Sequence, residues 1–404
     1  MSWSEKSLDQ LGFVSRGKSR HRPRDAAHLY GGPYPFVQTG DVKHAGLYLT
    51  DYSQTYSEEG LAQSKLWPAG TLCITIAANI ADTSILAIDA CFPDSVIGFI
   101  PDPEKADARF VKYLFDAVLK LQYRQFTQGA AQDNLSQAKL LALKFLVPDD
   151  VKEQTRIADF IATYDELIEN NRRRIQLLEE SARLLYQEWF VQLRFPGHEQ
   201  VKITDGVPEG WARLSVAECC EKPSYGYTAS ANQDAIGPKF LRITDIVPRS
   251  ISWANVPYCE ADEATTKKYQ LGEGDIVVAR TGATVGYAKR MPSLSEPVIY
   301  ASYLVKFSPN KSIVDDLILG IFMESEQYKD FVRGNAGGAA QPNANAQILG
   351  GAKLLVPSEL LQKEFRSNVA PLIEQKFLLE KQNTSLTKAR DLLLPKLMSG
   401  ELTI

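Results

Sequence analysis

One short segment near the N-terminus has the residue types and spacing of a phosphate-binding loop. The segment GFVSRGKS at 12–19 matches the pattern GxxxxGK[ST], with Lys18 and Ser19 in the positions that contact phosphate and magnesium. The run SILAID ends at Asp89, an acid that could hold the same metal ion. Such a loop works between a buried strand and a helix, because the helix N-terminus binds the phosphates. Polar residues precede this segment and RHRPRD follows it, so the sequence disfavours the site and leaves a nucleotide-binding enzyme only as an alternative.

The remaining polar residues form no further catalytic pattern. The chain has no HExxH metal motif, no GxSxG elbow and no Asn/Asp-Pro-Pro-aromatic motif that would hold a flipped base. Its five cysteines include no CxxC pair, which argues against a zinc site and a disulfide framework. We therefore expect a non-catalytic chain with no metal site and no cofactor of its own.

A Gly-Ala-Ala-Gln loop occurs twice and offers side chains that could read DNA bases. It is GAAQDN at 129–134 and GAAQPN at 338–343. Glutamine and asparagine pair bidentately with adenine, and small neighbours let a loop approach a nucleic-acid backbone. The alternative is that these amides only satisfy turns of their own backbone. The candidate DNA-binding residues in the two loops are Gln132, Asn134, Gln341 and Asn343.

The stretch ARTGATVGYAKR follows an apolar run, and its two glycines predict a hairpin. Arg280 has the planar fork that reads guanine, and Thr281 and Thr284 suit phosphate or thymine-methyl contacts. The corresponding segment of the first half, ITIAANIAD, has Asn79 in place of a basic residue. Two domains that bind different DNA sequences would show such a difference. An ordinary hairpin without nucleic-acid contacts is the alternative.

Basic residues alternate along a short tract near the N-terminus: Arg16, Lys18, Arg20, Arg22 and Arg24. The tract could contact phosphates, and a solvated surface loop is an equal alternative. The whole chain has 45 basic and 49 acidic residues and a net charge of −4. DNA binding would therefore need local patches or a partner that adds positive charge.

The two Gln-containing loops belong to an internal repeat. PFVQTGDV at 35–42 returns as KFLRITDIV at 239–247, and LALKFLVP at 141–148 returns as LGGAKLLVP at 349–357. The matched residues lie 204 positions apart early in each half and 209 apart from the loops onward: Phe36 with Phe240, Asp41 with Asp245, Gly70 with Gly274, Lys144 with Lys353, and Pro148 with Pro357. The chain therefore consists of two similar halves.

Each half has the same order of patterns. Strands are predicted at TLCITIA and SILAID in the first half, and at GDIVVA and VIYASYLVKF in the second. A helical stretch follows, through Phe110 to Leu121 and through Leu317 to Tyr328, and then the Gln-containing loop and a run that ends in Val-Pro. These patterns predict two pseudo-repeated α+β globular domains.

A long heptad pattern follows each Val-Pro. Seam positions alternate at spacings of three and four over more than four heptads, in segments of ~40 residues that span about 60 Å as helices. A seam that long needs a partner helix, so we expect the two helices to pair, with Asn171 and Asn383 fixing the register. Packing of each helix on its own domain alone is the alternative. The predicted seam residues include Ile161, Ile168, Asn171, Ile175, Leu178 and Leu185 in the first helix, and Leu372, Leu379, Asn383, Leu386 and Leu393 in the second.

The composition is that of an ordinary globular protein, with 44% apolar and 23% charged residues. The sequence has no run of about 18 apolar residues and no apolar signal-peptide core at its start. We expect a soluble, cytoplasmic protein with no membrane partner.

The whole pattern resembles the specificity subunit of a type I restriction-modification system. The resemblance rests on LIENNRRRIQLLEESARLLYQEWF at 167–190, VPEGWARLSV at 207–216, GDIVVARTGATVG, the two GAAQ loops, and ARDLLLPKLMSGEL at 389–402. These phrases follow the family's order of recognition domain, helix, recognition domain and helix over essentially the whole chain.

The resemblance implies a domain for each half of a bipartite DNA site. Residues 1–148 and 206–357 would be target recognition domains that read the major groove, and 149–195 and 358–404 would be spacer helices that pair antiparallel. Two methyltransferase (modification) subunits would dock on the helices and methylate adenine with S-adenosylmethionine. Restriction (motor-nuclease) subunits would join them for cleavage.

Loop position and side-chain chemistry add Thr39 in the first domain and Arg242 in the second to the predicted DNA-binding residues. Lys376 and Arg390 interrupt the second seam, which predicts that this helix faces a partner subunit as much as its mate. The first domain begins almost at Met1, which predicts a trimmed or irregular first strand. A coiled-coil assembly scaffold without DNA affinity is the remaining alternative.

Overall fold

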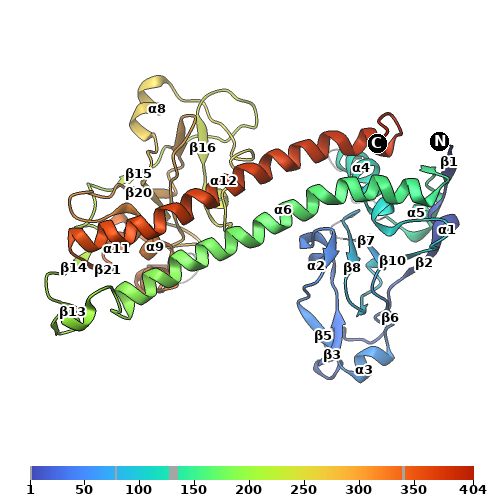
Figure 1. The fold of residues 1–404 in the computed structure, drawn as a ribbon, viewed down its shortest axis with the longest axis horizontal. Coiled ribbons are helices and arrows are strands. Elements are labelled where there is room, and N and C mark those ends of the chain that lie inside the picture. The colour runs from blue at the N-terminus through green and yellow to red at the C-terminus, as the bar shows by residue number, and fades with distance from the viewer. Residues whose placement is uncertain (1, 78–79, 127–134, 339–341) are drawn as a thin grey trace. The chain divides into compact units, whose positions relative to one another are not determined.

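The computed structural model divides into two compact units, and each unit contains one α+β region and part of both long helices (Figure 1). The first unit is Met1–Arg172 with Gln382–Ile404, and the second is Arg173–Lys381. This division cuts both helices, whereas the predicted domains kept each helix whole. The structure describes residues 2–77, 80–126, 135–338 and 342–404.

The first α+β region contains three sheets. A five-stranded sheet has the order β2-β10-β7-β8-β4, a four-stranded sheet has the order β5-β3-β9-β6, and β1 pairs with β11. The strands are β1 (Trp3–Lys6), β2 (Gly12–Arg16), β3 (Tyr30–Phe36), β4 (Tyr48–Leu49), β5 (Gln54–Tyr56), β6 (Leu66–Trp67), β7 (Leu72–Thr75), β8 (Thr83–Leu86), β9 (Ala90–Cys91), β10 (Val96–Pro101) and β11 (Phe145–Pro148). The helices are α1 (Leu8–Leu11), η1 (Ala27–Leu29), α2 (Thr39–His44), α3 (Glu58–Ala62), α4 (Ala108–Phe126) and α5 (Gln137–Ala142).

The second α+β region is built around a four-stranded sheet with the order β15-β20-β17-β18. The strands are β12 (Ile203–Thr204), β13 (Val207–Pro208), β14 (Ala212–Ser215), β15 (Ser224–Tyr225), β16 (Lys239–Leu241), β17 (Ile276–Ala279), β18 (Ala288–Arg290), β19 (Val298–Tyr300), β20 (Leu304–Phe307) and β21 (Lys353–Val356). The helices are η3 (His198–Gln200), α7 (Ile243–Ile246), α8 (Glu263–Tyr269), α9 (Asp316–Glu324), α10 (Glu326–Asn335) and α11 (Ala346–Gly350).

The predicted repeat is confirmed by the strand order. The order β2-β10-β7-β8 of the first region returns as β15-β20-β17-β18 in the second. Phe36 lies next to Cys91 in a parallel pair, and its predicted counterpart Phe240 lies next to Ile299 in a parallel pair. β1 pairs with β11 over four residues, as β14 does with β21, so the prediction of a trimmed first strand is wrong. The antiparallel register continues to Trp3 because β11 supplies a partner for every residue of β1.

Two predicted elements of the second half are each divided in two. The run VIYASYLVKF forms β19 and β20, which belong to different sheets, with a turn at 301–303 between them. The helical stretch at 317–328 forms α9 and α10, because Ser325 ends the first helix and its hydroxyl accepts a hydrogen bond from the Tyr328 amide at 3.3 Å. Apolar periodicity alone does not reveal either break, since buried apolar residues continue on both sides of it.

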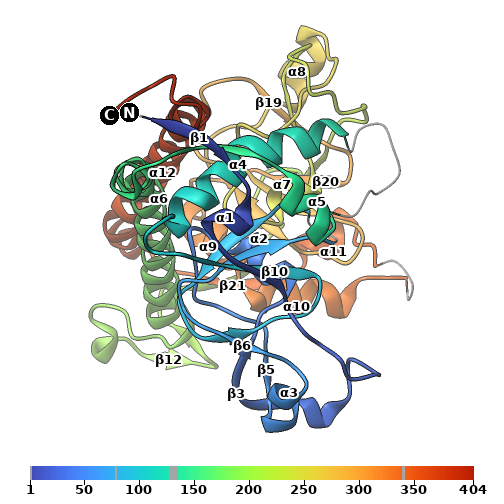
Figure 2. The same ribbon diagram turned by 90° about the vertical axis from the view of Figure 1, so that its right-hand side faces the viewer.

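Two long helices, α6 (Val151–Tyr186) and α12 (Glu359–Met398), lie side by side in opposite directions (Figure 1, Figure 2). A short π-helical turn, η2 (Gln187–Val191), follows α6. The predicted seam positions are buried or half-buried on both helices. In the first unit the Asn171 amide donates to Asn383 Oδ1 at 2.9 Å, and the Asn383 amide donates to the Ile168 carbonyl at 3.3 Å. The coiled-coil prediction is thus confirmed, including the contact of its two asparagines.

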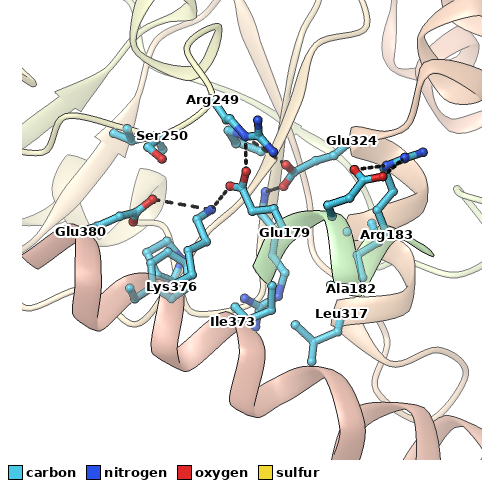
Figure 3. Close-up of a pocket in the computed structure, with 18 of the residues that line it drawn as sticks. Glu179, Ala182, Arg183, Arg249, Ser250, Leu317, Glu324, Ile373, Lys376 and Glu380 are labelled. Atoms are coloured by element: carbon cyan, nitrogen blue, oxygen red, sulfur yellow. Dashed lines mark hydrogen bonds and ion pairs between the residues drawn. The ribbon is translucent and has the colours of Figure 1, made fainter. Parts of the chain in front are cut away.

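The charged seam residues of α12 face α6, and the predicted contact of this helix with a partner subunit stays a prediction. In the first unit Arg390 contacts Asp165 at 2.5 Å. In the second unit Lys376 contacts Glu179 of α6 at 2.8 Å and Glu380 at 3.7 Å (Figure 3). The physical reason is that α6 carries an acid opposite each base, so both cations form ion pairs within the helix pair.

One glutamine, buried at Gln154 and half-buried at Gln362, joins each α+β region to the start of its helix. Gln154 accepts a hydrogen bond from the Asp107 amide at 3.1 Å and donates to the carbonyls of Lys105 and Pro148 at 3.1 and 3.0 Å. Gln362 repeats all three bonds in the second unit with Asp315, Ile313 and Pro357, at 2.7, 3.0 and 3.0 Å. Buried backbone groups need such partners, so both glutamines hold a helix N-terminus against its sheet.

The core of each unit runs without interruption from the sheets into the helix pair. In the first unit Phe110 and Phe115 share a cluster with Ile157, Ile161 and Leu397. In the second, Phe365 of α12 lies 4.8 Å from Phe190 and 5.7 Å from Trp189, measured between ring centroids. Each such side chain contributes about 1.5–3 kcal/mol when fully buried. Within the described residues, no helix combines the length and apolarity needed to cross a bilayer.

Candidate nucleic-acid interface

The hairpin predicted from ARTGATVGYAKR is present between β17 and β18. The chain reverses at Gly282 and Gly286, which have φ of 78° and 85°. Residues other than glycine rarely adopt these backbone conformations. The Gly286 amide donates to the Ala279 carbonyl at 2.9 Å. A Cβ on Gly286 would also lie 3.0 Å from Val332, so both the turn and the packing on α10 require glycine.

The second Gln-containing loop is hydrogen-bonded to the turn of this hairpin. Gly337 and Asn343 exchange two backbone hydrogen bonds, at 3.0 and 2.8 Å, that close the loop at its base. The Gly282 amide donates to the Pro342 carbonyl, and the Ala344 amide to the Arg280 carbonyl, both at 2.9 Å. Two predicted segments more than 50 residues apart in the sequence therefore form one surface.

This surface contains several of the predicted side chains. Thr281 is bridged to Asn343, which is exposed, and Thr284 is half-buried in the turn. Gln341 lies outside the described residues. We call the surface formed by 280–284 and the described ends of 337–343 the turn-loop surface.

Two tyrosines that sequence reasoning missed flank Arg280. The Arg280 guanidinium lies 4.9 Å from the centroid of the Tyr225 ring, and the Arg280 amide donates to the Tyr303 carbonyl at 3.0 Å. Tyr225 and Tyr303 are 41% and 61% exposed, which is unusual for large aromatic residues. The break in VIYASYLVKF could have indicated Tyr303, but no signal in the sequence places Tyr225 near Arg280.

Arg242 forms an ion pair with the neighbouring Asp245. It precedes α7, and its Nε and Nη2 donate to the Asp245 carboxylate at 3.0 and 2.9 Å. This contact with Asp245 holds the pKa of Arg242 above its ordinary value. The side chain stays 36% exposed, so its remaining nitrogen is open to a further contact.

The first region has Gln38 where the second has Arg242. The backbone N–H of Gln38 donates to the Asp41 carboxylate at 2.8 Å, and the backbone N–H of Arg242 donates to the Asp245 carboxylate at the same distance. Both residues directly precede a short helix. Sequence reasoning chose the next residue, Thr39, which begins α2 and is half-buried. The spacing of 204 between Asp41 and Asp245 could have identified Gln38.

The other predicted residues of the first region are Asn79, Gln132 and Asn134, and all three lie outside the described residues. The residue 204 positions before Arg280 is Ile76, which is 4% exposed. The described part of the first region therefore has an apolar core residue where the second has a half-buried arginine.

The segment GFVSRGKS does not have the geometry of a phosphate-binding loop. Residues 12–16 form strand β2, and no helix follows Ser19 directly. The amides of Gly17 and Lys18 donate to the carbonyls of Val96 and Phe92 at 2.9 and 3.1 Å, so they are not free to bind phosphate. The nucleotide-binding alternative is therefore wrong, because the chain uses the segment as an ordinary sheet strand.

The basic tract is partly neutralised by the protein itself. Arg24 donates to the Asp94 carboxylate at 2.9 Å, and Arg16 donates to the Asp94 carbonyl at 2.8 Å. Arg22 donates to carbonyls of its own loop. Lys18 and Arg20 are exposed and have no acid partner among the described residues. They are therefore the residues of the tract that are most available to contact phosphate.

A pocket of about 280 Å³ in the second unit is separate from the turn-loop surface. It lies beside the ion pair of Glu179 and Lys376, and Arg249 also donates to Glu179 (Figure 3). Lys289 contacts Glu324 at 3.1 Å on another wall. Because these charges neutralise one another, we interpret the pocket as part of the packing of the α+β region on its helices.

The described residues thus combine two repeated α+β regions with a pair of long helices. Residues 2–180 match the family model described as "Type I restriction modification DNA specificity domain". The MjaIX specificity subunit of Methanocaldococcus jannaschii is 21% identical over 100% of this chain and 94% of its own length. The HindI specificity subunit of Haemophilus influenzae is 22% identical over 99% of both chains.

A solved structure shows the same fold. The type I restriction-modification S subunit from M. genitalium matches with a TM-score of 0.58 at 15% identity, over 98% of this chain and 96% of that one. The chain is thus similar in sequence to type I restriction enzyme specificity subunits over its whole length, and its fold is that of a type I S subunit.

Proposed function

We propose that each α+β region reads one half of a bipartite double-stranded DNA site, and that α6 and α12 set the number of unread base pairs between the halves. The observation that carries this proposal is one recognition fold present twice with different polar residues at a matching position, Gln38 and Arg242. Two copies with different side chains suit two different half-sites, because base edges are read by side-chain donors and acceptors.

The turn-loop surface is the proposed contact of the second region. Its half-buried arginine and threonines and the exposed Asn343 are side chains of the types that commonly bind base edges and phosphates. The full set of proposed DNA-binding residues remains Thr39, Asn79, Gln132 and Asn134 in the first region, and Arg242, Arg280, Thr281, Thr284, Gln341 and Asn343 in the second.

We further propose that two methyltransferase (modification) subunits bind along α6 and α12. Leucines outside the seam support this, because they are 62–78% exposed on helices that already have a mate: Leu177, Leu360, Leu378 and Leu392. Restriction (motor-nuclease) subunits would join the same assembly for cleavage. These partners would also add the positive charge that DNA binding needs and that the chain, at −4, lacks.

In this proposal the chain catalyses nothing and binds no cofactor. S-adenosylmethionine belongs to the methyltransferase, which transfers the methyl group to adenine. Titration of S-adenosylmethionine should therefore give binding to the complex and none to the isolated chain. Binding by the isolated chain would contradict this part.

The test is methylation mapping of a genome that carries the chain and its neighbouring, demonstrably active methyltransferase, against the same genome without the chain. We expect a chain-dependent split motif with modified adenine in each half around a fixed gap. A continuous motif, or no chain-dependent motif, would contradict the proposal, and the second result would favour a scaffold without DNA affinity.

A further inference from the structure

We propose that Arg280 reads a guanine in the half-site of the second region, and that Tyr225 is the residue that positions it. This inference rests on the proposed function above and goes beyond it by naming one base and the side chain that holds its reader. It is carried by the surroundings of Arg280 on the turn-loop surface.

Arg280 differs from its neighbouring arginines in having no acid partner. The other five arginines from 242 to 366 all contact carboxylates: Arg242, Arg249, Arg290, Arg333 and Arg366. Arg280 has no hydrogen bond or ion pair from its side chain to any described residue. A guanidinium held on a surface without a carboxylate keeps its donors for a ligand.

The orientation of this guanidinium is fixed by an aromatic ring. Its carbon lies 4.9 Å from the Tyr225 centroid, within the range of a cation–π contact. The Nε atom is buried without a partner, whereas Nη1 and Nη2 are not among the buried nitrogens. The two terminal nitrogens therefore stay accessible as a fork, and such a fork donates to O6 and N7 of guanine in the major groove.

Tyr225 also connects this fork to the loop. Its hydroxyl accepts a hydrogen bond from the Ala346 amide at 3.1 Å, three residues after Asn343. The Ala344 amide donates to the Arg280 carbonyl at 2.9 Å from the other side. The arginine is therefore held at its backbone and over its side chain, and such preorganisation lowers the ordering cost of binding.

The experiment uses the complex of this chain with its methyltransferase and a DNA library in which each position of the mapped site is randomised in turn. Wild type should require guanine at one position of the half read by the second region. Arg280→Ala should lower that preference about 10- to 100-fold and leave every other position unchanged. Arg280→Gln should lose guanine at the same position and gain adenine, since glutamine pairs with adenine.

The tyrosine variants separate a positioning role from general stability. Tyr225→Leu, which removes the ring, should weaken the same single base preference nearly as far as Arg280→Ala. Tyr225→Phe, which keeps the ring and loses the hydroxyl, should weaken it only a few-fold. Arg213→Ala is the matched control, because Arg213 is an exposed arginine of β14 in the same unit without an acid partner among the described residues, and it should change no position.

The outcomes distinguish this inference from the proposed reading of a bipartite DNA site on which it rests. A wild-type complex without a split motif would overturn both. A split motif with unchanged base preferences in Arg280→Ala, or with equal weakening on all sequences, would overturn the inference alone, the latter by assigning Arg280 to phosphate. If Arg280→Ala does not assemble, Arg280→Gln, which keeps a polar side chain of similar reach, gives the same decision.

Discussion

Gln154 and Gln362 show most clearly how single residues organise this molecule. Each uses both ends of its side-chain amide on three backbone groups that connect a helix to its sheet. The two sets of bonds match in every partner position. The sequence did not reveal them, because a glutamine near the start of a polar helix looks like a surface residue.

Replacing either glutamine should destabilise its own unit. Gln154→Ala would leave three buried or half-buried backbone groups without this partner, and at about 1 kcal/mol for each hydrogen bond we expect a loss of about 2–4 kcal/mol. Amide hydrogen exchange of each unit measures this. Exposed glutamines of the same helices, Gln176 and Gln375, are the controls, and their alanine variants should change little. Equal effects of Gln154→Ala and Gln176→Ala would contradict the role of Gln154.

The residues of the turn-loop surface, the proposed DNA contact, could be predicted only in part. Arg280, Thr281 and Asn343 were predicted from side-chain chemistry, and the structure brings them together through the backbone. Tyr225 was missed because its contact with Arg280 joins strands β15 and β17, which the chain separates by about 50 residues and β20 separates in the sheet.

At the scale of elements, the helix pair is specified by polar residues as well as by its apolar seam. The asparagines at 171 and 383 contact each other, and the seam bases contact acids of α6. A heptad pattern predicts the pairing, since apolar spacing determines which face is buried. It does not predict which polar seam residues meet, because that depends on the register.

The asparagine pair should give a strong non-additive effect. Asn383→Leu would leave the buried Asn171 amide without its acceptor and should cost about 1–3 kcal/mol. The double variant Asn171→Leu with Asn383→Leu replaces both partners by apolar groups and should be more stable than that single variant. Urea unfolding of the wild type, the two single variants and the double variant gives the coupling free energy between the two asparagines. Strictly additive changes would show that the contact does not contribute.

Glu179 should make the stability of the second unit depend on pH. Burial raises the pKa of its carboxyl, but Lys376 and Arg249 outweigh that effect and hold the pKa below its ordinary value. A lowered carboxyl pKa stabilises the fold above the unfolded value of about 4.3, and this stability is lost as the pH falls through the folded pKa.

The change Glu179→Gln should therefore cost about 2 kcal/mol at pH 7 and progressively less below about pH 4. Urea titrations at several pH values give the difference between the two proteins. Glu180→Gln is the control, because the Glu180 side chain is 41% exposed and forms its ion pair with Arg183 of the same helix. A constant difference from pH 7 to pH 3 would show that the Glu179 charge does not stabilise the fold.

At the scale of the whole molecule, the repeat was the most informative feature of the sequence. Matched residues at offsets of 204 and 209 predicted two α+β regions, and the common strand order confirms them. The division of each region into several sheets could not be predicted, because one apolar run such as VIYASYLVKF supplies strands to two of them. Sheet membership is decided by partners distant in the sequence, which local patterns do not report.

The central claim is that one chain reads two half-sites at a fixed separation. The measurement that tests it most directly is the affinity of the chain–methyltransferase complex, at one salt concentration, for four DNA probes. They carry the intact mapped site, a scrambled first half, a scrambled second half, and one extra base pair in the gap. Each of the three altered probes should bind at least about a hundredfold more weakly than the intact site. Equal affinity for the intact probe and for any one of the altered probes would contradict it.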